Sequence, residues 1–559
     1  MTSRPRSRMP GGAALQTKVL AGLGVAGAAL LAFPAVAGAQ DVDPVEAVET
    51  LGKQTNLLWV ILGAILVIFM QAGFALVETG FCRAKHAAHV VSTNFAIFGL
   101  GFVGYYLVGY GLMFGGYSVP LIGFDNAPGD AMIGSGNWIF LWKGGFGLTD
   151  MAGQGAGGAA AIGFFLYMVA FMDTVATIPT GAMAERWKWN AFVGWGLFCG
   201  AIYYPLFGAW TWGGGWLAKL GDSADLGFGY VDFAGSGVVH SVGAAAGLAG
   251  AIVLGPRIGK FNKDGSANTI PGHHIPMAML GCFILLFGWF GFNAASTFAA
   301  TDVQFAVVAT NTALAGAFGA VVSMFYMQMK TGKPDPGMMV NGMLGGLVAI
   351  TAPCAFVDPW AAAVIGSIAG VLIPWAAGFI ERRGIDDPVG AVAVHGVGGG
   401  FGVLAVGLFS NGTYGAGWNA TTEGAAAESG LGVMGIFGGD FEVGLRQLGA
   451  QAIGVLTIWT VIFGIAFLFF TIQNAVMKGG IRPSADVEMA GMDIPEMGAL
   501  AYPEFELAIE GSDPEIGERA LVGSSRGSEP EATPATSTGF TTPGDGTTPP
   551  PGPRPYGGS

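Results

Sequence analysis

About eleven long apolar segments run through this sequence, and each is long enough to cross a lipid bilayer as a helix. A spanning helix needs about 20 mostly apolar residues, because the hydrocarbon core is roughly 30 Å thick. The segments lie at 56–80, 90–115, 155–180, 190–212, 234–255, 275–298, 303–327, 338–357, 359–380, 389–410 and 447–475. Only 11% of the residues are charged, whereas soluble proteins carry about 25%. We therefore predict an all-α, polytopic membrane protein.

Charge in the loops between these segments indicates their orientation. Loops that follow odd-numbered segments carry the basic residues Arg83, Lys85, Arg186, Lys188, Arg257, Lys260, Lys263, Lys330, Lys333, Arg382, Arg383, Lys478 and Arg482. Loops that follow even-numbered segments carry mainly Asp and Glu. Basic loops stay in the cytoplasm, so the pattern predicts a multi-pass protein of the cytoplasmic membrane, with its N-terminus outside and its C-terminus inside. The net charge of −13 argues against a nucleic-acid partner.

Both ends of the chain differ in composition from the predicted transmembrane domain at 56–476. Residues 1–39 are predicted to be a cleavable signal peptide, with a basic start, an apolar run over 19–33 and a small-residue cleavage site at Ala37-Gly38-Ala39. An uncleaved first helix is the alternative. The other expected segments are an outer N-terminal segment at 40–55, a cytoplasmic regulatory tail at 477–511 and a disordered Pro/Gly/Ser/Thr-rich tail at 512–559.

One short pattern occurs twice along the chain. It reads Val239-His240-Ser241-Val242-Gly243 in the fifth segment and Val394-His395-Gly396-Val397-Gly398 in the tenth. An odd number of segments in each repeat would insert the two repeats with opposite orientation. The pattern therefore predicts two inverted five-helix halves plus one extra helix, with the working site where the halves meet.

Of the six histidines, only His240 and His395 lie deep within apolar segments. Each stands eight residues beyond an aspartate, Asp232 or Asp387, at the end of its segment. Eight helical residues cover about 12 Å, which places both imidazoles near the middle of the bilayer. Ionisable residues at this depth usually mark a substrate path. The alternatives are two unrelated core histidines bonded to backbone carbonyls, or the axial ligands of a haem.

Two neutral imidazoles can exchange hydrogen bonds with a small neutral molecule and can pass a proton between them. The sequence around them contains no evident cage of carboxylates or carbonyls for a metal cation. The four cysteines have no metal-ligand spacing and are interpreted as buried small hydrophobes. We therefore expect no metal, no cofactor and no enzymatic activity.

The sixth segment ends in an aromatic cluster, residues 288–296 (GWFGFNAAS), and Trp212 ends the fourth segment at the same predicted face. Aromatic faces attract cations that have lost part of their water. The hydroxyl of Ser296 could replace one lost water molecule. An interfacial aromatic belt, which is common in membrane proteins, is the alternative.

Three acidic residues lie within or beside the apolar segments. Asp173 stands in the third segment with Tyr167 and Phe171, and we interpret it as a structural hydrogen-bond acceptor or a proton-handling group. Glu78 and Glu185 lie nearer the predicted inner face, where we expect each to pair with a local Arg or Lys.

Six ordered motifs resemble the ammonium transporter family (Amt/Mep/Rh), from about residue 55 to about residue 502. They are FMQAGFALVETGFCRAKH at 69–86, AMAERWKWN at 182–190, WTWGGGWLAKLG at 210–221, VDFAGSGVVH at 231–240, GWFGFNAAS at 288–296 and DDPVGAVAVHGVGG at 386–399. The last three are highly specific. The resemblance implies a bacterial-type Amt channel or transporter that forms homotrimers, with eleven helices and one pore in each subunit.

The resemblance also implies roles for nine residues. They are ammonium recruitment at Trp212, Ser296, Tyr167 and Asp232, a Phe gate at Phe171 and Phe292, and a pore lined by His240, His395 and Trp289. Within the recruitment site, Asp232 is expected to orient the others rather than to bind substrate. The chain departs from the commonest family pattern at Tyr167, where Phe is common, at Asp173, and at Gly390, where many members carry Asp.

The segment 491–505 is similar to the regulatory tail of the family, which contributes to control by PII-type signalling proteins. Met497 stands where many members have His. A PII-type partner at this tail is therefore an expectation that rests on the resemblance alone.

These features predict uptake of ammonium or ammonia across the cytoplasmic membrane by a protein embedded in membrane lipid. Methylammonium is expected to act as a substrate analogue. A buried charge costs several kcal/mol, so we expect the cation to lose its proton at the outer site and ammonia to pass the gate and the histidines. Potassium, which has no proton to lose, should be rejected. The sequence leaves open whether the proton follows. The alternative is an ammonium sensor with the same pore fold, suggested by the tail at 512–559.

Overall fold

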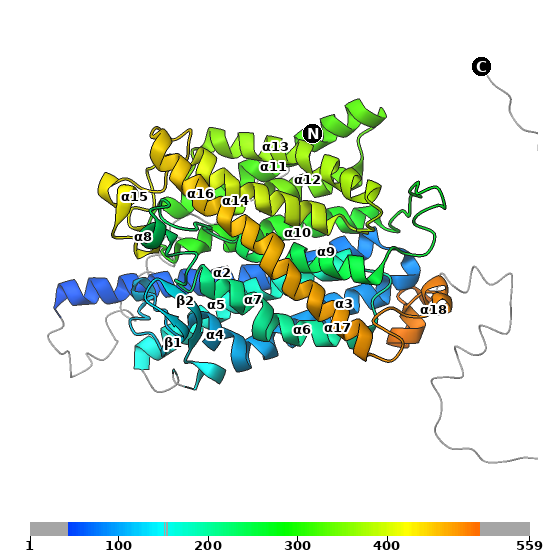
Figure 1. Cartoon of the computed structure of the whole chain (residues 1–559), viewed down its shortest axis with the longest axis horizontal. Helices are drawn as coiled ribbons and strands as arrows, with labels where there is room; N and C mark the ends of the chain where they lie inside the picture. Colours follow the sequence, from blue (N-terminus) through cyan, green and yellow to red (C-terminus); the bar gives the residue numbers. More distant parts are fainter. Residues whose placement is uncertain (1–42, 150, 152–154, 504–559) are drawn as a thin grey trace, which may run out of the picture. The chain divides into compact units, whose positions relative to one another are not determined.

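A computed structural model of the protein describes residues 43–149, 151 and 155–503. The signal peptide predicted at 1–39 and the tail predicted at 512–559 lie outside these residues. The regular secondary structure of the described chain is almost entirely helical, and the helices run along a common axis as one bundle (Figure 1). Lipid offers no hydrogen bonds to the backbone, and a helix satisfies its backbone groups internally, so long apolar segments adopt this form.

Each half of the bundle contains five helical segments in chain order. The first half consists of α2 (Pro44–Phe81); α3 (Ala87–Gly104) with η2 (Tyr105–Gly109) and α4 (Tyr110–Phe114); α5 (Gly155–Ala182); α6 (Trp189–Phe198) with η5 (Cys199–Tyr203) and α7 (Tyr204–Trp210); and η6 (Ser236–Ser241) with α9 (Val242–Leu254). The second half consists of α10 (Ile275–Asn293) with η7 (Ala294–Thr297); α11 (Gln304–Thr331); α12 (Pro336–Thr351); α13 (Pro359–Arg382); and η8 (Val392–Val397) with α14 (Gly398–Phe409).

The extra helix follows the second half and crosses the face of the bundle diagonally (Figure 1). It consists of α16 (Phe441–Thr457), η10 (Ile458–Ile462) and α17 (Phe463–Val476). Among the described residues, 10 helices are long and apolar enough to cross a membrane, and α12 is a shorter apolar helix packed between them. Every predicted segment therefore coincides with a helix, and the predicted fold class is confirmed.

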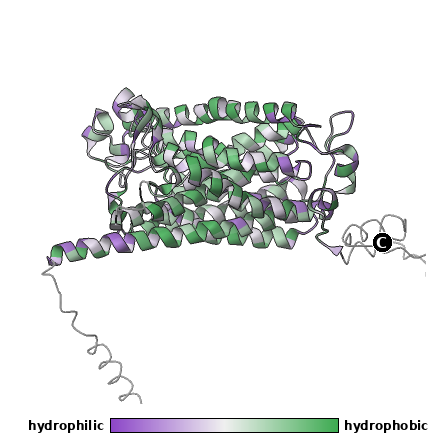
Figure 2. Ribbon diagram, turned by 90° about the horizontal axis from the view of Figure 1, so that it is seen from below, coloured by the Kyte–Doolittle hydropathy of each residue, from purple (hydrophilic) through white to green (hydrophobic). Residues whose placement is uncertain are grey.

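Hydropathy is distributed along the bundle as a membrane requires. Figure 2 shows hydrophobic residues through the middle of the bundle and hydrophilic residues mainly at its two ends. Large apolar side chains are exposed on the outer helices, among them Phe69, Phe283, Phe325, Trp375 and Leu468. A soluble protein rarely exposes apolar surface on this scale, whereas hydrocarbon accommodates it.

The first helix begins earlier than the apolar pattern predicts. The sequence predicted a span from residue 56, but α2 begins at Pro44, after Asp43 accepts a hydrogen bond from the backbone N–H of Val45. Its first turns carry polar side chains, including a Lys53–Glu49 ion pair of 3.0 Å one turn apart. Hydropathy marks only the part of a helix that suits lipid, so it missed these exposed turns.

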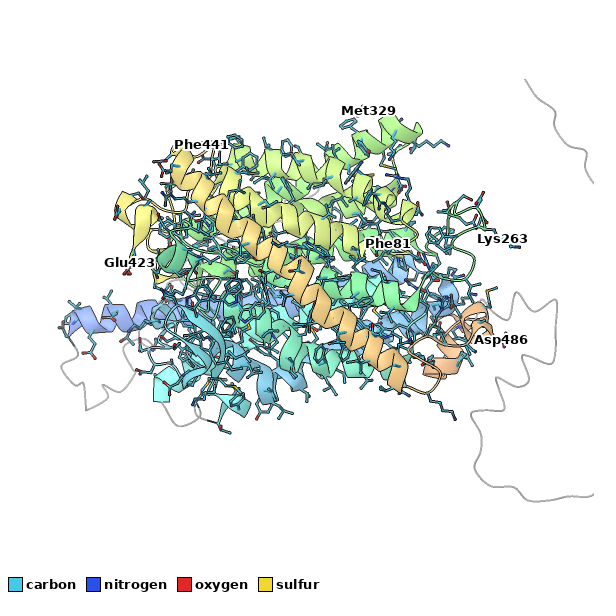
Figure 3. The ribbon with its side chains drawn as sticks, viewed as in Figure 1. Phe81, Lys263, Met329, Glu423, Phe441 and Asp486 are labelled. Carbon is cyan, nitrogen blue, oxygen red and sulfur yellow. The ribbon has the colours of Figure 1, made fainter. Side chains whose placement is uncertain are left out.

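Short elements cover the two ends of the bundle. One end carries the hairpin β1 (Asp130–Ser135) and β2 (Trp138–Lys143) together with η3 (Pro120–Ile122), η4 (Phe146–Leu148), α8 (Leu220–Ala224), η9 (Trp418–Ala420) and α15 (Gly424–Ser429). The other carries η1 (Ala84–His86), α18 (Ala485–Ala490) and η11 (Asp493–Met497). Figure 3 labels Glu423 at the first end, and Lys263 and Asp486 at the second. We call the first of these ends the Trp212 end and the second the Arg257 end.

Glycine lets the two halves approach closely where their first helices meet. On α10, a Cβ at Gly281 would lie 2.7 Å from the carbonyl oxygen of Gly73 on α2. On α2, a Cβ at Gly73 would in turn lie 2.7 Å from a side-chain carbon of Leu285. Small residues at such crossings allow backbone-to-backbone packing within lipid, which accounts for part of the high glycine content of the chain.

Candidate functional site

A cavity of about 600 Å³ opens at the Trp212 end of the bundle. Its lining includes four residues that the sequence assigned to recruitment or to the gate, namely Phe171, Trp212, Asp232 and Ser296. Most of the remaining lining is aromatic or glycine, and Lys219 is its one basic residue. We call this cavity the vestibule.

The indole of Trp212 is fixed on two sides. Its Nε1–H donates to the backbone carbonyl of Asp232 at 2.7 Å. Its ring meets the ring of Phe171 edge-on, with centroids 5.6 Å apart. The aromatic face is therefore held beside Phe171.

The hairpin fastens the loop that carries Trp212. The Nε1–H of Trp142 donates to the carbonyl of Gly213 at 2.9 Å, and that of Trp210 donates to the carbonyl of Phe140 at 3.0 Å. The backbone N–H of Trp216 donates to the carbonyl of Ile139 at 3.1 Å. The sequence analysis missed this hairpin, although the short, continuous run of aromatic and aliphatic residues at 138–142 was a signal for a strand.

Tyr167 lies behind the vestibule and does not line it. Its side chain is fully buried, and its hydroxyl lies 3.0 Å from Oγ of Ser296 and 3.1 Å from the carbonyl oxygen of Gly291. The Ser296 hydroxyl donates to the carbonyl of Phe292 at 2.8 Å. Because that bond uses its only proton, the Ser296 oxygen keeps lone pairs that can accept from a cation's N–H group.

The Asp232 side chain anchors the start of a pore helix. One carboxylate oxygen accepts from the N–H groups of Gly235 and Ser236, both at 2.9 Å, and the other accepts from Gly237 and Val238, both at 2.8 Å. Burial raises the pKa of Asp232 above its ordinary value, although these four N–H donors oppose the shift. The carboxylate thus fixes the start of η6, while the backbone carbonyl of the same residue holds the indole of Trp212.

Two phenylalanine rings close the floor of the vestibule. The centroids of Phe171 and Phe292 lie 4.2 Å apart, with 31° between the ring planes. On the far side, the ring of Phe292 lies 5.5 Å from the imidazole of His240. The two rings therefore separate the vestibule from the histidines.

His240 and His395 meet inside the bundle. Their Nδ1 atoms lie 3.1 Å apart and their ring centroids 5.1 Å apart, and both side chains are buried. Trp289 stacks on His240 at 5.2 Å and donates its Nε1–H to Oγ1 of Thr351 at 2.8 Å. A hydrogen bond between two Nδ1 atoms requires one imidazole to donate and the other to accept, so the neutral rings are opposite tautomers.

The short Nδ1–Nδ1 separation also decides between the alternatives for these two histidines. Two histidines that form a hydrogen bond with each other are not independent core residues bonded to carbonyls. Nor does this contact leave room between the two rings for a porphyrin whose iron bonds to both.

Both histidines lie in matching π-helical turns. His240 lies in η6 and His395 in η8, and each turn follows an aspartate that accepts backbone N–H bonds. Asp387 accepts from Ala391 at 2.9 Å and from Val392 at 2.8 Å. A π-helical turn inserts one residue and re-aims the side chain. The repeated pattern predicted from the sequence is thus a repeated structure.

A second, smaller cavity of about 20 Å³ lies beyond His395, toward the Arg257 end. Phe74 packs over His395 with a centroid distance of 6.1 Å and lines this cavity together with Glu78 and Asn341. The sequence analysis did not select Phe74, although it lies within the motif at 69–86. We call this cavity the exit cavity.

The two glutamates behave differently. Glu185 pairs with basic residues as predicted, at 2.6 Å from Nε of Arg83 and 3.1 Å from an NH group of Arg257. The same prediction for Glu78 is wrong, because it accepts from Nδ2 of Asn94 at 2.7 Å and forms no ion pair in the described part of the chain. The neighbouring Arg and Lys side chains are held by other acceptors at the Arg257 end.

Asp173 is buried in α5 and lines neither cavity. Its Oδ1 has no hydrogen-bond partner among the described residues. All four cysteines are free and buried, consistent with their interpretation as small hydrophobes. Across residues 43–149, 151 and 155–503, no group of three or more His, Cys, Asp or Glu could hold a metal ion.

The sequence is similar to one family of known proteins. The chain matches the profile of the Ammonium Transporter Family over residues 58–502. It is 41% identical over 482 residues to ammonium transporter Amt2 of Archaeoglobus fulgidus, covering 85% of this chain and 94% of that protein. It is 35% identical over 497 residues to ammonium transporter Amt1 of Haloferax mediterranei, covering 86% of this chain and 84% of that protein.

Solved structures show the same similarity. A structure described as a sensor Amt protein aligns with a TM-score of 0.68 at 35% identity, over 80% of this chain and 100% of that one. Mep2 of Candida albicans aligns with a TM-score of 0.64 at 25% identity, over 82% of this chain and 91% of that one. The similarity therefore extends over most of the chain in both sequence and fold.

Proposed function

The chain belongs to the ammonium transporter family, and we propose that it takes up ammonium or ammonia across the cytoplasmic membrane. In this proposal it acts as a transporter or channel and not as an enzyme. The Trp212 end faces outward and the Arg257 end faces the cytoplasm. The distribution of charge supports this orientation, because basic loops collect at the Arg257 end and acidic residues such as Glu423 at the other.

Recruitment takes place in the vestibule. The face of Trp212 attracts the cation, and the lone pairs of Ser296 accept one of its N–H groups. A cation–π contact contributes about 0.5–2 kcal/mol. That energy offsets part of the dehydration but is too small to carry a charge through the apolar interior.

The cation then loses a proton to water of the vestibule above the Phe gate. Desolvation disfavours the charged form of ammonium, so its effective pKa falls as it approaches Phe171 and Phe292. Neutral ammonia needs only a transient separation of the two rings. It then exchanges hydrogen bonds with His240 and His395, which pass it toward the exit cavity. Potassium cannot follow this route because it has no proton to release.

The observation that carries this proposal is the Nδ1–Nδ1 contact of 3.1 Å between two buried imidazoles behind a closed pair of phenylalanines. It provides a polar path for a neutral amine where an ion would be too costly.

We also propose that the bundle lies in membrane lipid, which the exposed apolar side chains support. Family membership supports a homotrimeric assembly and a PII-type partner at the tail.

Methylammonium uptake into liposomes that contain the purified full-length protein tests this function. We expect His240→Ala and His395→Ala each to reduce selective uptake by at least about tenfold, because either change removes one partner of the pair. His274→Ala is the matched control, since His274 lies outside the pore and only caps α10. Uptake that persists at the wild-type rate in both pore variants would contradict the mechanism.

An ammonium sensor is the second candidate. The similarity to a structure described as a sensor Amt protein favours it. The segment predicted as a regulatory tail, 477–511, also contacts α3, where Asp493 accepts from the backbone N–H groups of Ala88 and His89. A sensor would bind methylammonium without passing it. Binding measured by calorimetry with no vesicle uptake would support the sensor, whereas uptake at the expected rate supports the transporter.

A further inference from the structure

Glu78 is a buried carboxyl that the proposed function leaves without a role. It belongs to α2, and its side chain is 3% exposed. Phe74, one helical turn before it, packs over His395, so Glu78 continues the same face of α2 toward the Arg257 end. A role for Glu78 at this position rests on the proposed function, because it concerns the step after ammonia leaves the histidines.

Glu78 and His395 share the exit cavity. Its volume of about 20 Å³ is close to the roughly 10–15 Å³ that holds one water-sized molecule. Glu78 and His395 are its only titratable lining residues, and Asn341 adds a further polar group. A molecule of ammonia that has passed His395 therefore reaches a carboxyl group before it reaches the solvent.

The hydrogen-bond donors around Glu78 are few and neutral. Nδ2 of Asn94 donates to Oε2 at 2.7 Å. The Thr180 hydroxyl lies 2.9 Å and 2.8 Å from the two oxygens of Glu78, and it shares its single proton with the carbonyl oxygen of Thr177 at 2.6 Å. These donors only weakly stabilise the charged form of a buried carboxyl, so the surroundings of Glu78 favour the protonated form.

Space and charge around Glu78 are consistent with proton exchange. No Arg or Lys of the described chain pairs with it, so no fixed cation holds the carboxylate. A Cβ at Gly181 would lie 3.1 Å from Oε1 of Glu78 and 2.6 Å from a side-chain carbon of Val389. Glycine at this position therefore leaves the carboxyl room beside the cavity.

We propose that Glu78 is the group that returns a proton to ammonia at the exit of the pore. The O–H bond of Glu78 breaks, its proton forms the fourth N–H bond, and ammonium leaves toward the Arg257 end. The proton that ammonium released in the vestibule passes through His240 and His395 and restores the O–H bond. One ammonium enters, one leaves, and one positive charge crosses the membrane in each cycle.

Two measurements on full-length protein in liposomes test this step. Current on a supported membrane reports the charge moved, and uptake of radiolabelled methylammonium into the vesicles reports the flux of the amine. We expect Glu78→Gln to reduce the charge moved per ammonium at least about tenfold, because an amide cannot donate an acidic proton. The flux of the amine should change less than about twofold, since the amide has the same shape as the carboxyl.

Glu381→Gln is the matched control. It makes the same change at a glutamate that pairs with Lys260 and lines neither cavity, and it should keep the wild-type current. A wild-type current in Glu78→Gln, or an equal loss in Glu381→Gln, would overturn the inference. So would uptake by the wild type that moves no charge. Absence of any uptake by the wild type would instead refute the proposed function itself.

Infrared difference spectroscopy keeps the proposal testable if Glu78→Gln does not fold. Ammonium added to the wild-type protein should decrease the C=O stretching band of a protonated carboxyl. Glu78→Asp, which keeps the acid on a shorter side chain, should shift that band and retain part of the current. A wild-type spectrum without such a change would count against Glu78 as the proton donor.

Discussion

At the scale of single residues, the hydroxyl of Tyr167 distinguishes the recruitment site from one built only of aromatic rings. The hydroxyl lies within hydrogen-bond distance of Ser296 and of the carbonyl oxygens of Gly291 and Phe292. It does not line the vestibule, so in the proposed recruitment step it contacts Ser296 and not the substrate. In this chain Tyr167 is a positioning residue.

Tyr167→Phe should weaken recruitment more than turnover. Losing the hydroxyl should lower the free energy of unfolding by about 1 kcal/mol, because buried acceptors lose a donor. Ser296 would then be less well oriented, and the apparent KM for methylammonium should rise about threefold with little change in maximal rate. Thermal unfolding in detergent and uptake kinetics measure both effects.

Tyr106→Phe is the control for this change. Tyr106 is partly exposed on the outer face of the bundle, so its substitution should leave both quantities unchanged. An unaltered KM in Tyr167→Phe would show that Ser296 does not depend on the tyrosine hydroxyl.

At the scale of elements, each pore helix begins with an aspartate that binds its backbone N–H groups. Asp232 accepts four such bonds at η6, whereas Asp387 accepts two at η8. These bonds use donors that the first helical turn otherwise leaves unpaired. Each aspartate thereby sets the position of the histidine on its own helix.

Asp232→Ala should therefore cost more stability than Asp387→Ala. Removing the buried carboxylate leaves four N–H groups of η6 without an acceptor, and we expect a loss of about 3 kcal/mol or more. The loss at Asp387 should be about half as large, because half as many bonds break. Denaturant unfolding of the two variants in detergent measures the difference.

Asp232→Ala should also reduce methylammonium uptake more than Asp387→Ala does. Asp232→Ala should abolish methylammonium uptake, because the carboxylate fixes the start of the turn that holds His240, and the same residue presents the backbone carbonyl that accepts from Trp212. Equal losses of stability in the two variants would contradict the assignment of Asp232 as the stronger anchor.

At the scale of the whole molecule, Arg257 joins the two halves at its own end of the bundle. Its guanidinium donates to the two oxygens of Asp386 at 2.8 Å and 3.0 Å, and it lies 3.1 Å from Glu185. Glu185 belongs to the loop after α5, and Asp386 to the loop after α13. One buried cation therefore connects a loop of the first half with a loop of the second.

The pKa of Asp386 predicts how stability depends on pH. Burial alone would raise this pKa, but the hydrogen bond and charge of Arg257, with the nearby charge of Arg186, outweigh burial and lower it to about 2. A carboxyl whose pKa is lower when folded stabilises the protein above its ordinary pKa of 3.8. That contribution is lost as the pH falls through about 2.

Asp386→Asn should lower the free energy of unfolding at pH 7 by about 3 kcal/mol, because it leaves Arg257 with half of its buried charge partners. The difference from wild type should shrink as the pH falls from about 5 toward 2. Unfolding in detergent across this range measures it, with Asp264→Asn in an exposed loop as the control. A difference that stays constant with pH would exclude Asp386 as its source.

The sequence alone determined the spanning helices, their number and the two histidines buried among them. Lipid imposes a strict rule, since each spanning segment must be apolar, long and helical, and departures such as His240 and His395 are conspicuous. The repeated pattern around these histidines also indicated two inverted halves. Hydropathy missed the polar first turns of α2 and of α16, because polar turns give no such signal.

Only the tertiary structure decided what the polar side chains bind. Glu78 was expected to meet a cation, but its partners are Asn94 and Thr180, the second of which is 102 residues away. The hairpin behind Trp212 and the bond from Tyr167 to Ser296 likewise join segments far apart in the chain. Apolar length is a property of each segment by itself, whereas a hydrogen bond depends on which segments pack together.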